Sequence, residues 1–179
     1  MNELKIAAIG GGTGLSTMLK GLKLHTRKIT AIVSVADDGG SSGVLRTDMG
    51  MLPPGDVRNC IAALSDVEEE YSTLLNYRFK DGVFAGHTVG NMLLAAINET
   101  TDNFDEAVTK LSRLVGISGT VIPVSNESIV LGAVLDNGET ILGESNIGHH
   151  DGTKARIDHV FTKPSSPAPV ESALKAISN

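Results

Sequence analysis

Two short apolar runs near the start of the chain are each followed by a glycine-rich loop. The runs cover Lys5–Ile9 and Ile29–Val35, and each is continuous rather than alternating, which is typical of a strand buried on both faces. The loops cover residues 10–14 and 36–43. If the two strands are parallel neighbours, both loops leave the sheet at its carboxyl edge, where open α/β sheets bind their ligands.

Apolar residues recur at helical spacing through much of the remaining chain, which predicts amphipathic helices. Two capping boxes, Asp66 with Glu69 and Asn103 with Glu106, mark helix starts, and Gly116 marks a helix end. The paired prolines at 53–54 forbid a continuous helix there and suggest a rigid connector. The helical segments are 15–22, 57–64, 71–79, 89–97, 104–115 and 170–177.

After residue 116 the pattern changes from helical to β. Residues 120–124, 129–135, 140–142 and 157–162 are strand-like, and residues 136–139, Asp-Asn-Gly-Glu, form a strong hairpin-turn signature. The whole pattern predicts an α/β fold, a wound and mostly parallel sheet with an antiparallel hairpin excursion. A wound unit is completed by a further parallel strand, so we expect residues 1–179 to be a single domain truncated at its C-terminal side.

Composition narrows the class of partner. The 179 residues carry a net charge of −6 and no basic run, which argues against nucleic acid or an anionic membrane. The single cysteine, Cys60, has apolar neighbours and is expected to be a core thiol in a reducing compartment. The chain shows neither a signal pattern nor an apolar run of about 20 residues, so the expected location is the cytoplasm.

The first loop, Gly10-Gly11-Gly12-Thr13-Gly14, has the properties of a phosphate-binding turn. Glycines let the backbone approach a phosphate, and the helix that follows offers free N–H groups. The loop matches neither standard fingerprint, because Leu15 stands where the third dinucleotide glycine belongs and no Gly-Lys-Ser/Thr follows. The plainer interpretation is a turn used only for tight strand–helix packing.

The second loop combines two carboxylates and two serines in a glycine-rich frame. Asp37 is suited to accept hydrogen bonds from ribose hydroxyls, and Asp38 is suited to hold a divalent metal together with phosphate oxygens. Ser41 and Ser42 add donors within a few residues. A solvated turn is the alternative interpretation of this loop.

Further polar residues surround the prolines: Arg46, Asp56, Arg58 and Asn59. Asp56 stands where a helix N-cap residue belongs, so capping alone would account for it.

A second glycine-flanked helix start, residues 86–91, offers His87 and Asn91 as candidate groups of the same crevice. His149, His150 and Asp151 have metal-friendly chemistry, but adjacent residues diverge, and we expect a surface loop there.

Taken together, residues 10–14, 36–46, 52–58 and 86–91 resemble the YvcK/CofD-like family, whose YvcK branch comprises the gluconeogenesis factors. The resemblance runs in order across most of the chain and implies a Rossmann-like three-layer fold. It also implies two functions. YvcK-like proteins bind UDP-sugars such as UDP-N-acetylglucosamine and act in carbon metabolism, cell-wall homeostasis and cell shape. CofD-like proteins transfer a phosphoenolpyruvate- or phospholactate-derived group during coenzyme F420 synthesis, with a divalent metal.

The sequence after Asp38 departs from the transferase branch, because the expected aromatic-containing segment is replaced by Gly-Gly-Ser-Ser-Gly-Val-Leu-Arg. With four Phe, two Tyr and no Trp, the chain has little material to stack on a deazaflavin ring. The first hypothesis is therefore a nucleotide-sugar-binding regulatory protein. The alternative is a CofD-type transferase, with Mg²⁺ as cofactor and Asp38 and Asp56 as metal-linked residues. A nicotinamide-dependent oxidoreductase is disfavoured by Leu15.

The expected partner is a small nucleotide-sugar, with neither nucleic acid nor a membrane span involved, and the resemblance is compatible with self-association. Catalytic residues stay unassigned. The candidate binding residues are Gly10, Gly11, Gly12, Thr13, Gly14, Asp37, Asp38, Ser41, Ser42, Arg46, Asn59, His87 and Asn91.

Overall fold

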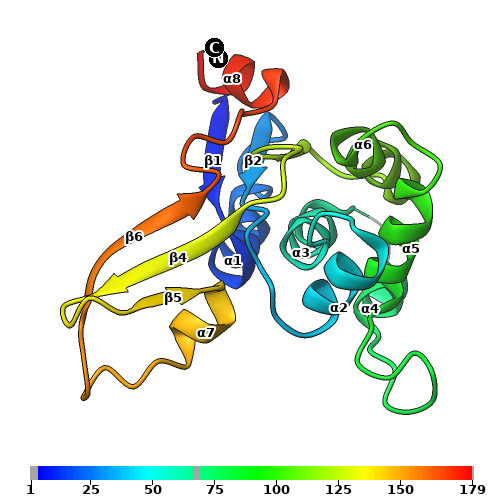
Figure 1. The fold of residues 1–179 in the computed structure, drawn as a ribbon. Helices are drawn as coiled ribbons and strands as arrows, with labels where there is room; N and C mark the ends of the chain where they lie inside the picture. The colour runs from blue at the N-terminus through cyan, green and yellow to red at the C-terminus, as the bar shows by residue number, and fades with distance from the viewer. Residues whose placement is uncertain (1–3, 67–68, 179) are drawn as a thin grey trace.

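The computed structural model describes residues 4–66 and 69–178. The first part of the chain is an α/β section, and an antiparallel section and a final helix follow it (Figure 1). In order they are β1 (Ile6–Gly10), α1 (Gly12–Leu22), β2 (Ile29–Val33), α2 (Gly40–Met49), α3 (Gly55–Leu64), α4 (Glu69–Asn76), α5 (Val89–Asn98), α6 (Phe104–Val115), β3 (Thr120–Pro123), β4 (Val130–Leu135), β5 (Thr140–Leu142), α7 (Glu144–Gly148), β6 (Ile157–Lys163) and α8 (Glu171–Ser178).

The central sheet is parallel and has the order β1-β2-β3. Ile6 pairs with Ile29 at one end of β1 and Gly10 pairs with Val33 at the other, so the loops after β1 and β2 leave the sheet side by side. β3 adds to the far side of β2 in the same direction. The predicted parallel neighbours are thereby confirmed, together with the fold class.

The main core lies between one face of this sheet and the helices that follow it. It includes Leu19 of α1, Ile61 of α3 and Leu111 of α6, each essentially inaccessible to solvent. A smaller cluster on the opposite face joins Ile32 and Ile122 to α8. The sheet is thus the middle layer of the predicted three, with α1, α3 and α6 on one face and α8 on the other.

One prediction about β1 is wrong. Its continuous apolar run indicated burial on both faces, yet only Ala8 is buried, and the side chain of Ile9 is 63% exposed. The described residues include no strand that pairs with the outer edge of β1. The α8 cluster covers the second face at β2 and β3, which leaves Ile9 open.

The antiparallel excursion is confirmed as a second sheet with the order β5-β4-β6. It extends away from α4, α5 and α6, with α7 beneath it (Figure 1). The Asn137 side chain accepts from the Glu139 N–H inside the predicted turn, and Gly138 has a positive φ of 86°. That conformation suits glycine, as the Asn-Gly signature indicated.

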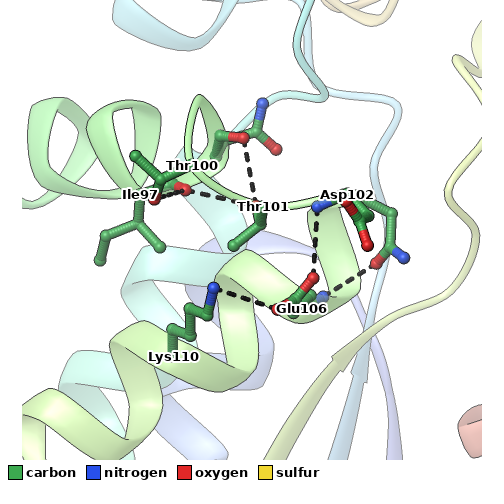
Figure 2. Close-up of polar contacts among 8 residues, drawn as sticks. Ile97, Thr100, Thr101, Asp102, Glu106 and Lys110 are labelled. Atoms are coloured by element: carbon green, nitrogen blue, oxygen red, sulfur yellow. Dashed lines mark hydrogen bonds and ion pairs between the residues drawn. The ribbon is translucent and has the colours of Figure 1, made fainter.

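Asn103 is confirmed as the N-cap of α6, although Glu106 bonds the N–H of Asp102 in place of the Asn103 N–H that a capping box uses. Asn103 Oδ1 accepts from the Glu106 N–H at 2.9 Å, and Glu106 reaches back to the Asp102 N–H at 3.2 Å and pairs with Lys110 at 3.0 Å (Figure 2). The helix ends at Gly116 in the left-handed conformation, as predicted. The box at Asp66 requires the Glu69 side chain, which lies outside the described residues.

Two helices were not predicted. Residues 40–49, interpreted as loop, form α2, and residues 144–148 form α7. Both have glycine at the N-cap and few buried apolar side chains, so the 3.6-residue pattern that reveals a helix is weak in them.

Cys60 is fully buried in the core, as expected, and burial raises the pKa of its thiol to about 12. Within residues 4–66 and 69–178, the helices are too short or too polar to cross a membrane.

Candidate functional site

A cavity of about 730 Å³ opens at the carboxyl edge of the parallel sheet. All three strands contribute to it at or just beyond their ends, and the antiparallel sheet supplies the facing wall. Its lining residues are Ile9, Gly10, Gly11, Gly12, Thr13, Gly14, Ser34, Ala36, Asp37, Asp56, Val124, Ile129, Leu131, Glu144 and Thr162.

The glycine loop forms the floor of this cavity and runs directly into α1. Gly11 is the N-cap of α1 and has no side chain to cap the helix, while the Asp56 carboxylate accepts from the Gly12 N–H. The first N–H groups of a helix have no acceptor within the helix, so this end is suited to an anion. A Cβ built on Gly12 would lie 2.7 Å from Asp56 Oδ1, so the absence of a side chain is what lets this carboxylate pack on the loop.

Asp37 occupies the neighbouring position, just after β2. Its Oδ1 accepts from the Gly39 N–H at 2.9 Å, and its Oδ2 would lie 3.2 Å from a Cβ built on Gly55. The Ser42 hydroxyl accepts from the Gly55 N–H at 3.1 Å and so joins the starts of α2 and α3. Asp37 is thus held where two helices begin, and it faces both the cavity and a second recess beside it.

Burial and neighbouring negative charge raise the pKa of two carboxyl groups of the site, Asp56 and Glu144. Burial is the largest cause at Asp56, and the charge of Asp37 adds to it, while the Gly12 N–H and Arg58 act in the opposite direction; the net result is a raised pKa. The pKa of Glu144 is raised in the same way, by burial and then by Asp37, Asp56 and Asp38. The cavity therefore favours a proton, a donor group or a cation beside these oxygens.

Asp38 has a different role from Asp37. Its Oδ1 accepts from the Ser145 N–H at 2.8 Å, at the start of α7. Gly143, the N-cap of α7, has a φ of 96°, and a Cβ built there would lie 2.2 Å from Asp38 Oδ2. Only glycine fits this position, so Asp38 fixes the antiparallel sheet to the second loop.

A chain of polar contacts leads from α2 into the helical layer. Ser41 Oγ lies 3.0 Å from His87 Nδ1 and accepts from Asn91 Nδ2 at 3.0 Å. Asn91 Oδ1 accepts from Arg58 Nε at 3.2 Å, and Asn76 Oδ1 accepts from Arg58 Nη1. Ser41, Arg58 and Asn91 are buried, which makes this network a fixed part of the fold.

The second recess, of about 260 Å³, lies between this network and the two aspartates. Its lining residues are Asp37, Gly39, Gly40, Ser41, Ser42, Gly55, Asp56, Arg58, Asn59, Arg78 and Asn91.

The predicted site residues divide among these features. The glycine loop and Asp37 line the cavity, and Ser41, Ser42, Asn59 and Asn91 line the recess. His87 touches Ser41 without lining either space. Arg46 lies apart from both, because its guanidinium donates to Ser128 Oγ and the Ile129 carbonyl, each at 2.8 Å.

Sequence reasoning left Arg58, Arg78 and Glu144 out of the candidate binding set. The sequence places Arg58 two residues after Asp56 and close to the paired prolines, but nothing in the sequence indicates that Arg58 is buried. Glu144 and Arg78 reach the site from segments with no motif of their own. The loop of His149, His150 and Asp151 stays at the surface, as expected.

The site can bind phosphate at helix starts and donor groups at its carboxylates. Among the described residues, no three His, Cys, Asp or Glu side chains are arranged to hold a metal ion. Mg²⁺ usually takes one or two protein carboxylates plus phosphate oxygens. Asp37 and Asp56 fit a cation that arrives with a phosphorylated ligand, whereas Asp38 is engaged with α7.

The chain is similar to proteins of one family along nearly its whole length. The family model described as 2-phospho-L-lactate transferase CofD matches residues 6–179. A protein of Thermoanaerobacterium thermosulfurigenes is 52% identical over 175 residues, covering 97% of this chain and 54% of its own length. The Bacillus subtilis protein named Gluconeogenesis factor is 46% identical over 174 residues, with the same coverage.

Solved structures agree with these relatives. A UPF0052-family protein from Bacillus halodurans superposes with a TM-score of 0.89 at 42% identity, covering 97% of this chain and 56% of that one. The chain thus spans about half the length of the relatives it matches. From the match over residues 6–179 and the relatives at 46–52% identity, the chain belongs to the CofD family, among the proteins named gluconeogenesis factor.

Proposed function

We propose that this chain binds a nucleotide-sugar of the UDP-N-acetylglucosamine type and serves as a regulatory protein of carbon metabolism, cell-wall homeostasis and cell shape. The observation that carries the proposal is the glycine-rich start of α1, which faces a 730 Å³ cavity at the carboxyl edge of the sheet. The names of the relatives support the metabolic part.

In this arrangement the diphosphate lies against the N–H groups of residues 13 and 14, where the helix start favours negative charge, because the Gly12 N–H already donates to Asp56. Asp37 accepts from ribose or sugar hydroxyls, since its carboxylate faces the same cavity from the next strand end. Apolar side chains of Ile129 and Leu131 line the opposite wall and offer a surface for the flat faces of the ligand.

Titration calorimetry with UDP-N-acetylglucosamine tests the proposal directly. Asp37→Ala is expected to weaken binding about tenfold, the loss of one hydrogen bond to a charged group. Asp48→Ala is the matched control, because Asp48 is exposed on α2 and lines neither the cavity nor the recess.

Gly12→Asp is expected to abolish binding, because it adds a carboxylate where the diphosphate would lie and beside Asp56. Gly21→Ala, in the same helix but exposed and without a neighbour near its Cβ, is expected to bind like the wild type. Absence of heat with millimolar ligand would refute the proposed function.

The transferase alternative has one observation in its favour. Burial and then the charge of Asp37 raise the pKa of both Asp56 and Glu144 in the cavity, and a divalent cation would stabilise their charged forms. When bound with a phosphorylated substrate, such a cation would neutralise charge that develops on the transferred phosphate. This alternative predicts Mg²⁺-dependent turnover that Asp37→Asn and Asp56→Asn each abolish; turnover that survives both changes would exclude it.

A further inference from the structure

Another cavity lies at the amino edge of the parallel sheet, at the opposite end of the strands from the glycine loop. We call it the amino-edge cavity. It is bounded by the starts of β1, β2 and β3 and by the end of α8, which lies at this end of the strands (Figure 1). Its volume of about 620 Å³ is in the range that small-molecule sites occupy.

The charged residues that line the amino-edge cavity are all positive. Among the described residues they are Lys5, Arg27 and Lys28. Arg27 pairs with Asp66 at 3.4 Å, but Asp66 does not line the cavity. The charged residues that line the glycine-loop cavity are, in contrast, all carboxylates. A chain of net charge −6 thus has a positive cavity at one edge of its sheet, and a cleft of one charge concentrates ions of the other.

Two of these cations are neighbours across β1 and β2. Ile6 pairs with Ile29, and the Ile6 N–H donates to the Lys28 carbonyl at 2.9 Å, so Lys5 stands next to Lys28. Like charges on adjacent strands destabilise a sheet. Lys5 is exposed and forms no ion pair within the described part of the chain. An anion bound between the two strands would relieve this repulsion.

Two threonine hydroxyls add hydrogen-bond donors to the same cavity. Thr30 of β2 and Thr120 of β3 are paired in the sheet register, and both line the cavity. Neither hydroxyl has a hydrogen-bond partner among residues 4–66 and 69–178. Ile177 of α8 supplies an apolar wall and is 57% exposed. Cations, hydroxyl donors and an apolar wall together suit an anion that carries a short carbon skeleton.

We propose that the amino-edge cavity binds a small organic anion with two or more negative charges, carried by carboxylate or phosphate groups. Lys5 and Lys28 meet its charge, Thr30 and Thr120 donate to its oxygens, and Ile177 contacts its carbon skeleton. Carboxylates and phosphates both accept such charge-assisted hydrogen bonds. The site lies at the opposite end of the strands from the proposed nucleotide-sugar site, and it does not depend on that proposal.

Citrate and pyrophosphate are the two probes, each titrated by calorimetry into the purified protein at low ionic strength. Citrate offers only carboxylates and pyrophosphate only phosphates, so binding of either one supports the site and identifies the group that it takes. Lys5→Met and Lys28→Met are each expected to weaken binding at least fivefold, because one charge-assisted contact is lost. Thr30→Val keeps the β-branched shape and is expected to weaken binding about threefold through the lost hydroxyl.

Lys80→Met is the matched control, at an exposed lysine between α4 and α5 that does not line the cavity. It changes the net charge by the same amount as Lys5→Met, so a general electrostatic effect would appear in both variants. The control is expected to bind both probes like the wild type.

The proposal is overturned if the wild-type protein binds neither probe at millimolar concentration, or if Lys5→Met and Lys28→Met bind as tightly as Lys80→Met. Pyrophosphate binding that Gly12→Asp removes and Lys5→Met spares would place the anion at the glycine loop and also overturn it. Citrate binding that Lys28→Met weakens, in a protein that gives no heat with UDP-N-acetylglucosamine, would support this site while refuting the proposed function.

Discussion

Replacing Gly12 with alanine tests whether the Asp56 carboxylate packs on the glycine loop. The new Cβ would lie 2.7 Å from Oδ1 of Asp56, where ordinary contact begins at 3.4 Å. Either the carboxylate or the start of α1 must therefore move by about 0.7 Å, which weakens the Gly12 N–H contact with Asp56. Overpacking of this kind costs about 1–3 kcal/mol, and alanine returns about 0.5–1 kcal/mol of helix propensity.

The expected result is a variant about 1 kcal/mol less stable than the wild type in urea unfolding at pH 7. Gly21→Ala in the same helix is the matched control, because no atom lies within 4 Å of its Cβ. It should gain about 0.5–1 kcal/mol from helix propensity alone. The two alanine variants should thus melt about 5 °C apart.

Equal stability of Gly12→Ala and Gly21→Ala would refute the packing of Asp56 on the loop. Without that packing, there would be no reason to expect the glycine loop and Asp56 to contact the same ligand. Measuring UDP-N-acetylglucosamine binding on both variants completes the test, since only Gly12→Ala should lose affinity.

Three further predictions follow from the burial and backbone geometry. Because burial raises the pKa of Asp56 on folding, this carboxyl contributes stability below about pH 4 that is lost as the pH rises toward neutrality. Asp56→Asn should therefore gain stability relative to the wild type between pH 4 and pH 7 in thermal melts, and an unchanged difference would contradict the raised pKa. The Cys60 thiol, fully buried and with its pKa raised to about 12, should resist a disulfide reagent until urea unfolds the protein; rapid reaction in the native state would contradict its burial. Gly119 and Gly116 both have positive φ, but a Cβ on Gly119 would lie 2.6 Å from the Ile29 carbonyl oxygen, so Gly119→Ala should cost about 2 kcal/mol more than Gly116→Ala in urea unfolding.

The sequence by itself determined the parts of this protein that depend on neighbouring residues. Continuous apolar runs followed by glycines gave β1, β2 and the loop before α1, and the Asn103 N-cap and Gly116 fixed both ends of α6. The Asn-Gly turn likewise determined the hairpin of β4 and β5. These features are local, because hydrogen bonding and backbone conformation within a few residues decide them.

Only the tertiary structure decided which groups meet at the site. Asp37 and Asp38 are adjacent in the sequence and chemically alike, yet Asp37 faces the cavity and Asp38 holds the start of α7. Arg58 became a buried cation because α4 and α5 close over α3, and Ile9 is exposed because no described element covers it. Periodicity records that a residue is apolar or polar, whereas burial and charge pairing depend on contacts between segments far apart in the chain.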